Sequence, residues 1–215
     1  MATNPLLSAL NEGPARQSSG DVAAAQRRRM LAAMVAAVAD KGYAAVAVSD
    51  VVARARVSRA TFYEQFTDKS DCFLAAFRAC ADSLATTMRD GQDSDLTPRE
   101  RVRALFDTYL EGVAAFPEGA RVCLVEVHAA GPRAAEARRQ VQQTYARVIR
   151  SIYDELARAG EPVRPLTDFD WEALVGAVSS IVTNRVAAGR AAELPELADP
   201  FERFLLGHFG LDVPS

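Results

Sequence analysis

Apolar residues recur every three to four positions through most of this chain, and this spacing constrains its fold more than any other feature. After Lys69, for example, the recurring residues are Phe73, Leu74, Phe77, Cys80, Ala81, Leu84 and Met88. Residues three and four apart share one face of an α-helix, so the spacing predicts amphipathic helices with one buried side. Strand-type alternation is confined to residues 44–49, a run too short to build a sheet. We therefore expect an all-α fold.

Residues that favour helix ends divide the chain into successive helices. Gly42 is placed to end the first helix, and Ser49 and Ser58 are expected to cap the starts of the next two. Prolines and glycines then mark the breaks near residues 117–119, 131–132 and 160–167. The expected helical segments are 26–40, 49–55, 59–66, 68–88, 98–113, 122–130, 133–159, 168–188 and 201–208.

Three regions follow from this division. Residues 1–20 combine Asn, Gly, Pro and Ser without a period and are expected to form a mobile tail. Residues 21–70 are expected to form a three-helix helix-turn-helix DNA-binding domain. Residues 71–215 are expected to form a helical domain for effector binding and dimerisation.

The stretch from Val48 to Lys69 indicates DNA binding. It predicts two short helices joined by a tight turn, with Phe62 and Phe66 facing inward. A helix that enters the major groove needs small or hydrogen-bonding residues at its exposed start, and residues 58–61 (Ser-Arg-Ala-Thr) satisfy this requirement. Arg59 can pair with guanine, while the Thr61 hydroxyl can reach a base or a phosphate.

Charge along the chain supports the same interpretation. Residues 21–70 hold eight basic and five acidic residues, although the whole chain carries a net charge of −3. A basic region on an acidic chain is typical of a DNA-binding domain joined to another domain, although a solvated basic face would look the same. The predicted DNA contacts, which include the phosphate contacts Tyr63 and Lys69, are Arg27, Arg28, Ser49, Arg56, Ser58, Arg59, Ala60, Thr61, Tyr63 and Lys69.

The sequence VSRATFYEQFTDKSDCF, preceded by RRRMLAAMVAAVADKGYAAVAVSDVVARA, resembles the DNA-binding domain of TetR-type transcriptional repressors. The resemblance covers about residues 26–77. Arg56 stands where this family commonly has glycine, and a left-handed conformation there would cost about 1 kcal/mol. Either the turn is remodelled, or Arg56 contributes a phosphate contact.

The resemblance implies a homodimer that reads a near-palindromic operator. It also implies a C-terminal helical domain that binds a small molecule and thereby changes the spacing of the two DNA-binding domains. The second half of the chain carries no family-wide motif, so its site residues come from composition alone.

For dimerisation, we expect the helix at 168–188 and the last helix at 201–208 to pair with a second copy. Small residues allow helices to approach closely, and apolar residues fill the seam. The alternative is that these helices are simply core. The predicted interface residues are Gly176, Val178, Ile181, Phe204 and Leu205.

For the effector, we expect apolar helix positions interleaved with a few polar ones. Their aromatic character favours a small apolar molecule, although each residue taken alone is more typical of ordinary core or surface. The predicted residues are Phe106, Tyr109, Val113, Glu126, His128, Tyr145, Trp171 and Asn184.

Several classes of protein are disfavoured. Cys72, Cys80 and Cys123 match no zinc motif and are expected to be small buried residues, with redox sensing as the alternative. No cofactor, metal, secretion signal or membrane span is expected, which leaves the cytoplasm as the default location. With no phosphate loop, HExxH or GxSxG motif, we do not expect an enzyme. The main alternative is a DNA-binding activator or architectural factor without an effector.

Overall fold

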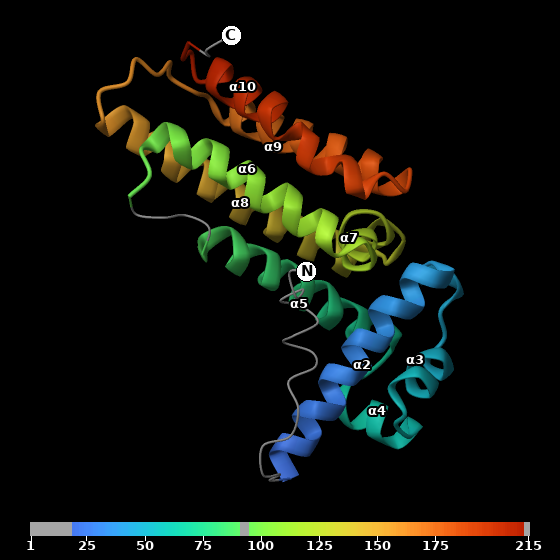
Figure 1. The fold of residues 1–215 in the computed structure, drawn as a ribbon. Coiled ribbons are helices and arrows are strands. Elements are labelled where there is room, and N and C mark those ends of the chain that lie inside the picture. Colours follow the sequence, from blue (N-terminus) through green and yellow to red (C-terminus); the bar gives the residue numbers. More distant parts are fainter. Residues whose placement is uncertain (1–18, 91–94, 213–215) are drawn as a thin grey trace. The chain divides into compact units, whose positions relative to one another are not determined.

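The computed structural model describes residues 19–90 and 95–212 (Figure 1). Every regular element within these ranges is helical, which confirms the all-α prediction. None of these helices combines the length and apolar character that crossing a bilayer would require. The elements are α2 (Ser19–Lys41), η1 (Tyr43–Ala45), α3 (Val48–Ala55), α4 (Arg59–Gln65), α5 (Lys69–Asp90), α6 (Pro98–Ala115), α7 (Pro117–Leu124), η2 (Glu126–Ala129), α8 (Pro132–Arg158), α9 (Asp168–Ala187), η3 (Ala191–Leu197) and α10 (Ala198–His208).

The described residues form two compact units. The first contains α2, η1, α3, α4 and α5 as far as Ser83, together with Glu118–Arg138, which we call the middle segment. The second contains Leu84–Pro117 and the chain from Arg139 onward. The first unit thus extends beyond the predicted DNA-binding domain and includes residues from the middle of the sequence.

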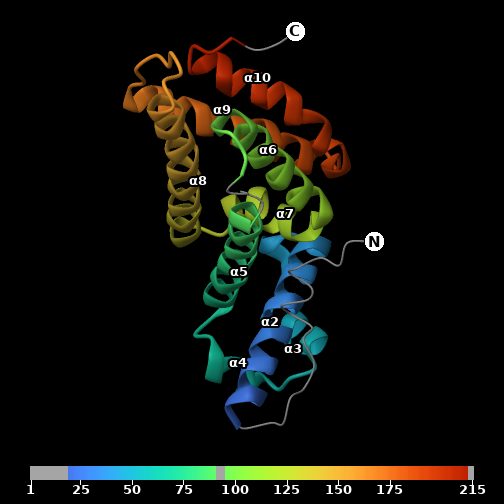
Figure 2. The ribbon, with the colours of Figure 1, turned by 60° about the vertical axis from the view of Figure 1, so that its left-hand side comes forward.

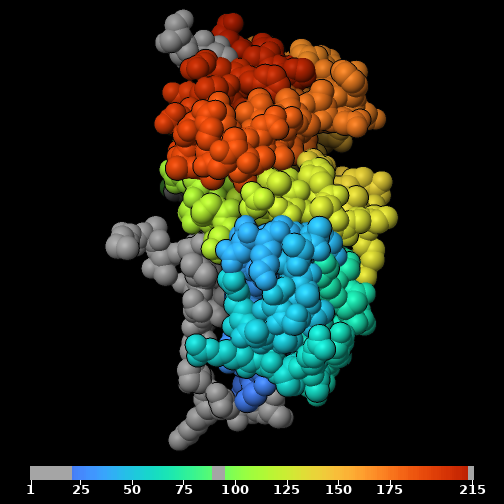
Figure 3. Space-filling view, turned by 90° about the vertical axis from the view of Figure 1, so that its right-hand side faces the viewer, coloured from blue at the N-terminus to red at the C-terminus, as the bar shows by residue number. Residues whose placement is uncertain are grey.

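The first unit is built around three packed helices. α2 packs against α3, and α4 buries the fully enclosed Phe62 and the nearly enclosed Phe66. This confirms the inward orientation predicted for both rings. Figure 3 shows the end of α2, the following turn and the start of α3 (light blue) at the surface. Further core side chains come from α2 and α5, namely Met30, Met34, Val38, Phe73 and Phe77.

The starts of α4, α3 and α2 differ in how closely they follow the predicted caps and boundaries. Ser58 caps α4 as expected, because its Oγ accepts a 3.0 Å hydrogen bond from the Thr61 amide. The cap predicted at Ser49 is wrong, since α3 begins one residue earlier and Ala47 donates its amide to the Asp50 carboxylate at 2.8 Å. α2 begins at Ser19, well before the predicted start. The alanine-rich stretch there favours helix without an apolar period. The remainder of the predicted tail lies outside the described residues.

The second unit packs α6 against η3 and α10 (Figure 2). Phe106 of α6 stacks on Phe201 of α10 with ring centroids 5.4 Å apart. Other buried side chains of this unit are Leu110, Leu156, Leu174, Leu194 and Leu205.

Candidate nucleic-acid interface

The exposed face of α4 has the character of a recognition helix. Arg59, Ala60 and Tyr63 are exposed, and Tyr63 reaches 56% exposure although the neighbouring Phe62 is fully buried. The Thr61 side chain is partly buried, and its hydroxyl lies 2.9 Å from Ser58 Oγ. Small and hydrogen-bonding groups therefore occupy the exposed start of the helix, where base edges are read in helix-turn-helix proteins.

The turn before α4 holds an arginine in a conformation that glycine normally adopts. Arg56 has φ 54° and ψ 50°, and it is the one non-glycine residue with positive φ in the described ranges. Its amide donates to Ala53 O at 3.3 Å, and the Val57 amide donates to Val52 O at 3.1 Å. The turn therefore has the left-handed geometry expected for glycine at this position, and the Arg56 side chain projects into solvent.

Two of the predicted DNA-contacting cations also hold the three helices together. Arg27 donates to the carbonyl of Gln65 at 3.1 Å and lies 4.4 Å from the Phe66 ring centroid. Lys69 donates to Tyr43 O at 3.0 Å and to Val46 O at 2.9 Å. The Arg27 charge is thus fixed between α2 and the end of α4, and the Lys69 charge is fixed against η1, with donors of both side chains already engaged. Of the other predicted contacts, Arg28 is partly buried and Ser49 is exposed.

The structure does not gather all predicted effector residues in one place. Glu126 belongs to the first unit, where it accepts a 2.8 Å hydrogen bond from the Tyr43 amide. His128, two residues further along the chain, is exposed, as is Asn184 on α9.

The aromatic members of that set form three separate contacts in the second unit. Tyr109 and Tyr145 meet edge to face with centroids 5.8 Å apart, joining α6 to α8. Trp171 packs against Tyr153 at 5.3 Å, and Phe106 stacks on α10 as described above. Val113 is buried on α6, one turn beyond Tyr109. Of the predicted effector residues, Phe106, Tyr109 and Val113 therefore lie on α6 and Tyr145 lies on α8, and the Tyr109–Tyr145 contact joins the two helices.

An open groove between α6 and α10 was not expected from the sequence. Its volume is about 510 Å³, and its two arginines are already paired with carboxylates. Arg99 donates two 2.7 Å hydrogen bonds to Glu161, and this pairing lowers the pKa of that carboxyl. Both arginine charges of the groove are thus paired within the protein. Its lining residues are Leu96, Arg99, Glu100, Arg103, Ala104, Asp107, Glu202 and Leu206.

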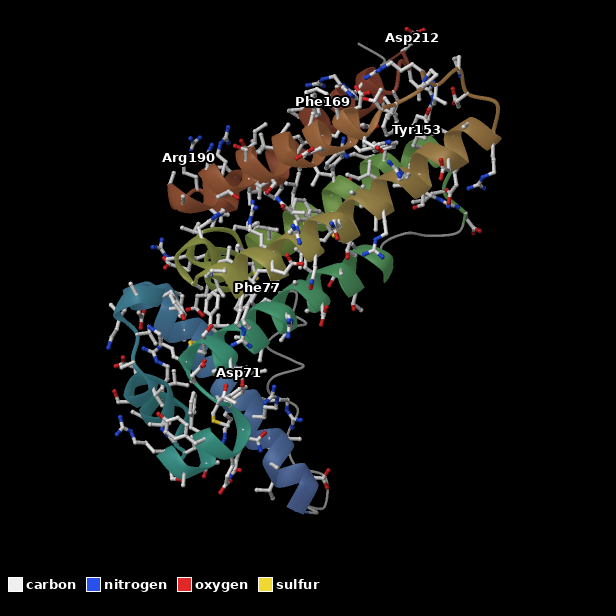
Figure 4. All side chains as sticks on the ribbon, turned by 180° about the vertical axis from the view of Figure 1, so that it is seen from behind. Asp71, Phe77, Tyr153, Phe169, Arg190 and Asp212 are labelled. Atoms are coloured by element: carbon white, nitrogen blue, oxygen red, sulfur yellow. The ribbon has the colours of Figure 1, made fainter. Side chains whose placement is uncertain are left out.

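The predicted dimer residues mostly lie at the surface. Ile181 and Phe204 are each 41% exposed, Gly176 is exposed, and Val178 is partly exposed. Leu205 is buried within its own subunit. Phe169 at the start of α9 was not predicted as a surface residue, yet it is 77% exposed (Figure 4).

The cysteine thiols are poorly suited to redox chemistry. Burial raises the pKa of Cys72 to about 12, and a hydrogen bond with Cys80 raises the pKa of Cys123. Cys72 and Cys80 are buried, as expected, and Cys123 is partly buried with its thiol donating to Phe77 O at 3.7 Å. Protonated thiols are weak nucleophiles at neutral pH.

A capped recognition helix, a tight preceding turn and a supporting α2 define a helix-turn-helix DNA-binding protein with a second helical unit. Comparison with known families agrees, because residues 30–76 match the model for bacterial regulatory proteins of the tetR family. Residues 95–190 match the C-terminal domain of tetracyclin repressor-like proteins. The chain belongs to the TetR family, whose members are DNA-binding transcription regulators and not enzymes.

Individual relatives are distant but consistent in fold. The fatty acid degradation regulator FadR from Bacillus halodurans superposes with a TM-score of 0.75 at 21% identity, covering 84% of this chain and 94% of that one. FadR from Bacillus subtilis, solved in complex with stearoyl-CoA, superposes with a TM-score of 0.75 at 19% identity, covering 84% of this chain and 97% of that one. The transcriptional activator FasR from Mycolicibacterium smegmatis is 23% identical over 62% of this chain, and the match spans 59% of that protein.

Proposed function

We propose that this protein is a transcriptional repressor that leaves its operator when a small apolar effector binds its second helical unit. The observation that carries the proposal is the exposed face of α4, with Arg59 and Tyr63 projecting from a helix whose other side is buried. Such a protein works where the chromosome lies, in the cytoplasm.

In this proposal, Arg59 and Thr61 read bases, the small side chains of Ser58 and Ala60 allow the helix to approach the groove closely, and Tyr63 donates to a phosphate. Arg56 projects from the turn toward the phosphates. Arg27, Arg28, Ser49 and Lys69 add charge or hydrogen bonds at the edge of the contact. Base contacts confer specificity, and phosphate contacts supply affinity that depends on salt.

Two copies of the chain are proposed to pair through α9 and α10. The exposed apolar side chains Ile181 and Phe204 lie on these helices, and Gly176 has open space where a Cβ would project. A symmetric dimer contacts two equivalent half-sites, so the operator is proposed to be near-palindromic.

The effector is proposed to bind beside the aromatic pair of Tyr109 and Tyr145. Aromatic and aliphatic side chains on α6 and α8 suit a ligand with an apolar body. The Bacillus subtilis relative was solved with stearoyl-CoA, which favours an acyl thioester as the first class of ligand to test.

The second candidate is an activator of transcription, because the Mycolicibacterium relative is named as one. A reporter gene behind the protein's own promoter distinguishes the two. Deleting the regulator raises expression for a repressor and lowers it for an activator.

The DNA-binding part of the proposal is tested by titrating a duplex from the upstream region of the gene. Affinity is expected to fall by about a thousandfold between roughly 50 and 200 mM salt, because phosphate contacts release counterions. No binding at low salt would overturn the proposal. Adding long-chain acyl-CoA to the complex then tests release, with free CoA as the control for its nucleotide part.

A further inference from the structure

Charged side chains hold the turn between α2 and α3 from two directions. The Tyr43 amide donates to Glu126 Oε2 at 2.8 Å, and the Tyr43 carbonyl accepts a hydrogen bond from Lys69 Nζ at 3.0 Å. Lys69 also lies 4.3 Å from the Tyr43 ring centroid. Hydrogen bonds that involve an ionised partner are stronger than neutral ones, so this turn is fixed at both polar groups of one residue.

Gly42 allows the close approach of the carboxylate. Its φ of 77° and ψ of 150° suit glycine, and a Cβ at this position would lie 3.3 Å from Glu126 Oε2. The turn therefore combines a conformation that favours glycine with a surface that leaves little room for any side chain.

Glu126 has the properties of an anchoring group. It is only 9% exposed, and among the residues whose burial is described it is the one buried charged side chain. Its second oxygen, Oε1, lies 3.0 Å from Arg121. A buried carboxylate is tolerated when it is paired and hydrogen-bonded, and here each oxygen has a partner.

The position of Glu126 in the chain connects this anchor to the two helices of the proposed effector site. The middle segment, which carries Glu126, follows α6 directly and runs into α8. Those two helices also carry Tyr109 and Tyr145. A displacement of α6 relative to α8 therefore acts on the middle segment through the covalent chain, and Glu126 connects that segment to the α2–α3 turn.

We propose that Glu126 is a positioning residue that pins the α2–α3 turn and couples the middle segment to the DNA-reading helices. The coupling to DNA rests on the proposed function, whereas the pin itself does not. Because coupling between sites is reciprocal, DNA bound at α4 must also alter the middle segment.

Amide hydrogen exchange tests the pin in the free protein. Glu126→Leu removes both acceptors, and we expect exchange at the Tyr43 amide to become about ten- to hundredfold faster. Glu126→Gln keeps one carbonyl acceptor and should give a smaller increase, which serves as the test if the leucine variant fails to fold. Glu118→Gln, an exposed change in the same segment, should leave this amide unchanged. Equal exchange in all four proteins would overturn the pin.

The same method tests the coupling, with a duplex that the wild-type protein selects from a random 30-base-pair library as the probe. Binding of this duplex should change exchange across the middle segment in wild type and Glu118→Gln. In Glu126→Leu or Glu126→Gln, measured at saturating duplex, that change should be lost or reduced. An unchanged segment in wild type, or a full response in the Glu126 variants, would overturn the coupling. Failure to select any duplex would overturn both the proposed function and the coupling, while the free-protein measurement still decides the pin.

Discussion

Asp170 near the start of α9 lies 3.1 Å from Nε2 of His208 in the last turn of α10. The same carboxylate oxygen accepts a 3.0 Å hydrogen bond from Arg164, and the other oxygen accepts from the amide and the hydroxyl of Thr167. One acidic side chain thus caps a helix and ties two other segments to it.

This arrangement predicts a pH-dependent contribution to stability. The hydrogen bonds from Thr167, followed by that from Arg164, hold the pKa of Asp170 well below its ordinary value. A carboxyl with a depressed native pKa stabilises the fold fully above its unfolded pKa, near 4, and loses that contribution as pH falls further. We expect Asp170→Asn to lower Tm at pH 7 and the deficit to shrink below about pH 4, measured by circular dichroism. Asp168→Asn, whose carboxylate is fully solvent-exposed, is the control. A deficit that stays the same down to pH 2 would contradict the assignment.

Arg56 should influence stability and DNA binding in opposite directions. Glycine relieves a left-handed penalty of about 1–2 kcal/mol but adds freedom to the unfolded chain, so Arg56→Gly should stabilise by up to about 1 kcal/mol in urea unfolding. It should also weaken DNA binding and reduce the salt slope by about 1 if the side chain contacts a phosphate. Arg56→Ala keeps the strain and loses the charge, so it should share only the binding defect. Equal stability of the two variants would argue against strain at this turn.

Phe62 and Tyr63 are adjacent aromatics with different expected roles. Phe62→Ala should destabilise the first unit by about 3–5 kcal/mol, because its ring is fully buried against Phe66 at a centroid distance of 5.4 Å. Tyr63→Ala removes a ring that is 56% exposed and should change stability little. Thermal unfolding of both variants provides the comparison. Similar losses of stability would mean that α4 does not present the face described above.

Arg59 is expected to read sequence and Tyr63 to supply affinity. Arg59→Ala should cost about 1–3 kcal/mol on the preferred duplex and relax the preference at one base pair. Tyr63→Phe should weaken binding to all duplexes by a similar factor, because a phosphate contact carries no sequence information. Selection from a randomised library followed by anisotropy titration separates these effects. Unchanged specificity in Arg59→Ala would remove it from the base-reading set.

The sequence was sufficient to predict what depends on neighbouring residues. Ser58 lies three residues from the amide that it caps, and the spacing of Phe62 and Phe66 defines their shared face. The cap predicted at Ser49 is wrong because α3 already begins at Val48, with the Ala47 amide donating to the Asp50 carboxylate, so that Ser49 lies inside the helix. A local pattern of capping residues does not show which acceptor is used.

Tertiary contacts explain what the sequence could not show. Glu126 was grouped with effector residues by composition, yet its partner Tyr43 is 83 positions away. Likewise, nothing in the sequence distinguishes a lysine that faces phosphate from one that, like Lys69, binds two backbone carbonyls. Only the packed structure supplies those partners.

The surface of α9 and α10 leads to the last prediction, on dimerisation. Phe204 is 41% exposed on α10, and a symmetric interface would place this position in the contact of both copies. Phe204→Glu then introduces two unpaired carboxylates into one apolar seam, and we expect dimerisation to weaken by about a hundredfold or more in sedimentation experiments. Ala157→Glu adds the same charge at an exposed position on α8 and should leave the dimer intact. If the two variants sediment alike as dimers, the interface lies on another face, and the exposed side chains of Phe204 and Ile181 need a different partner.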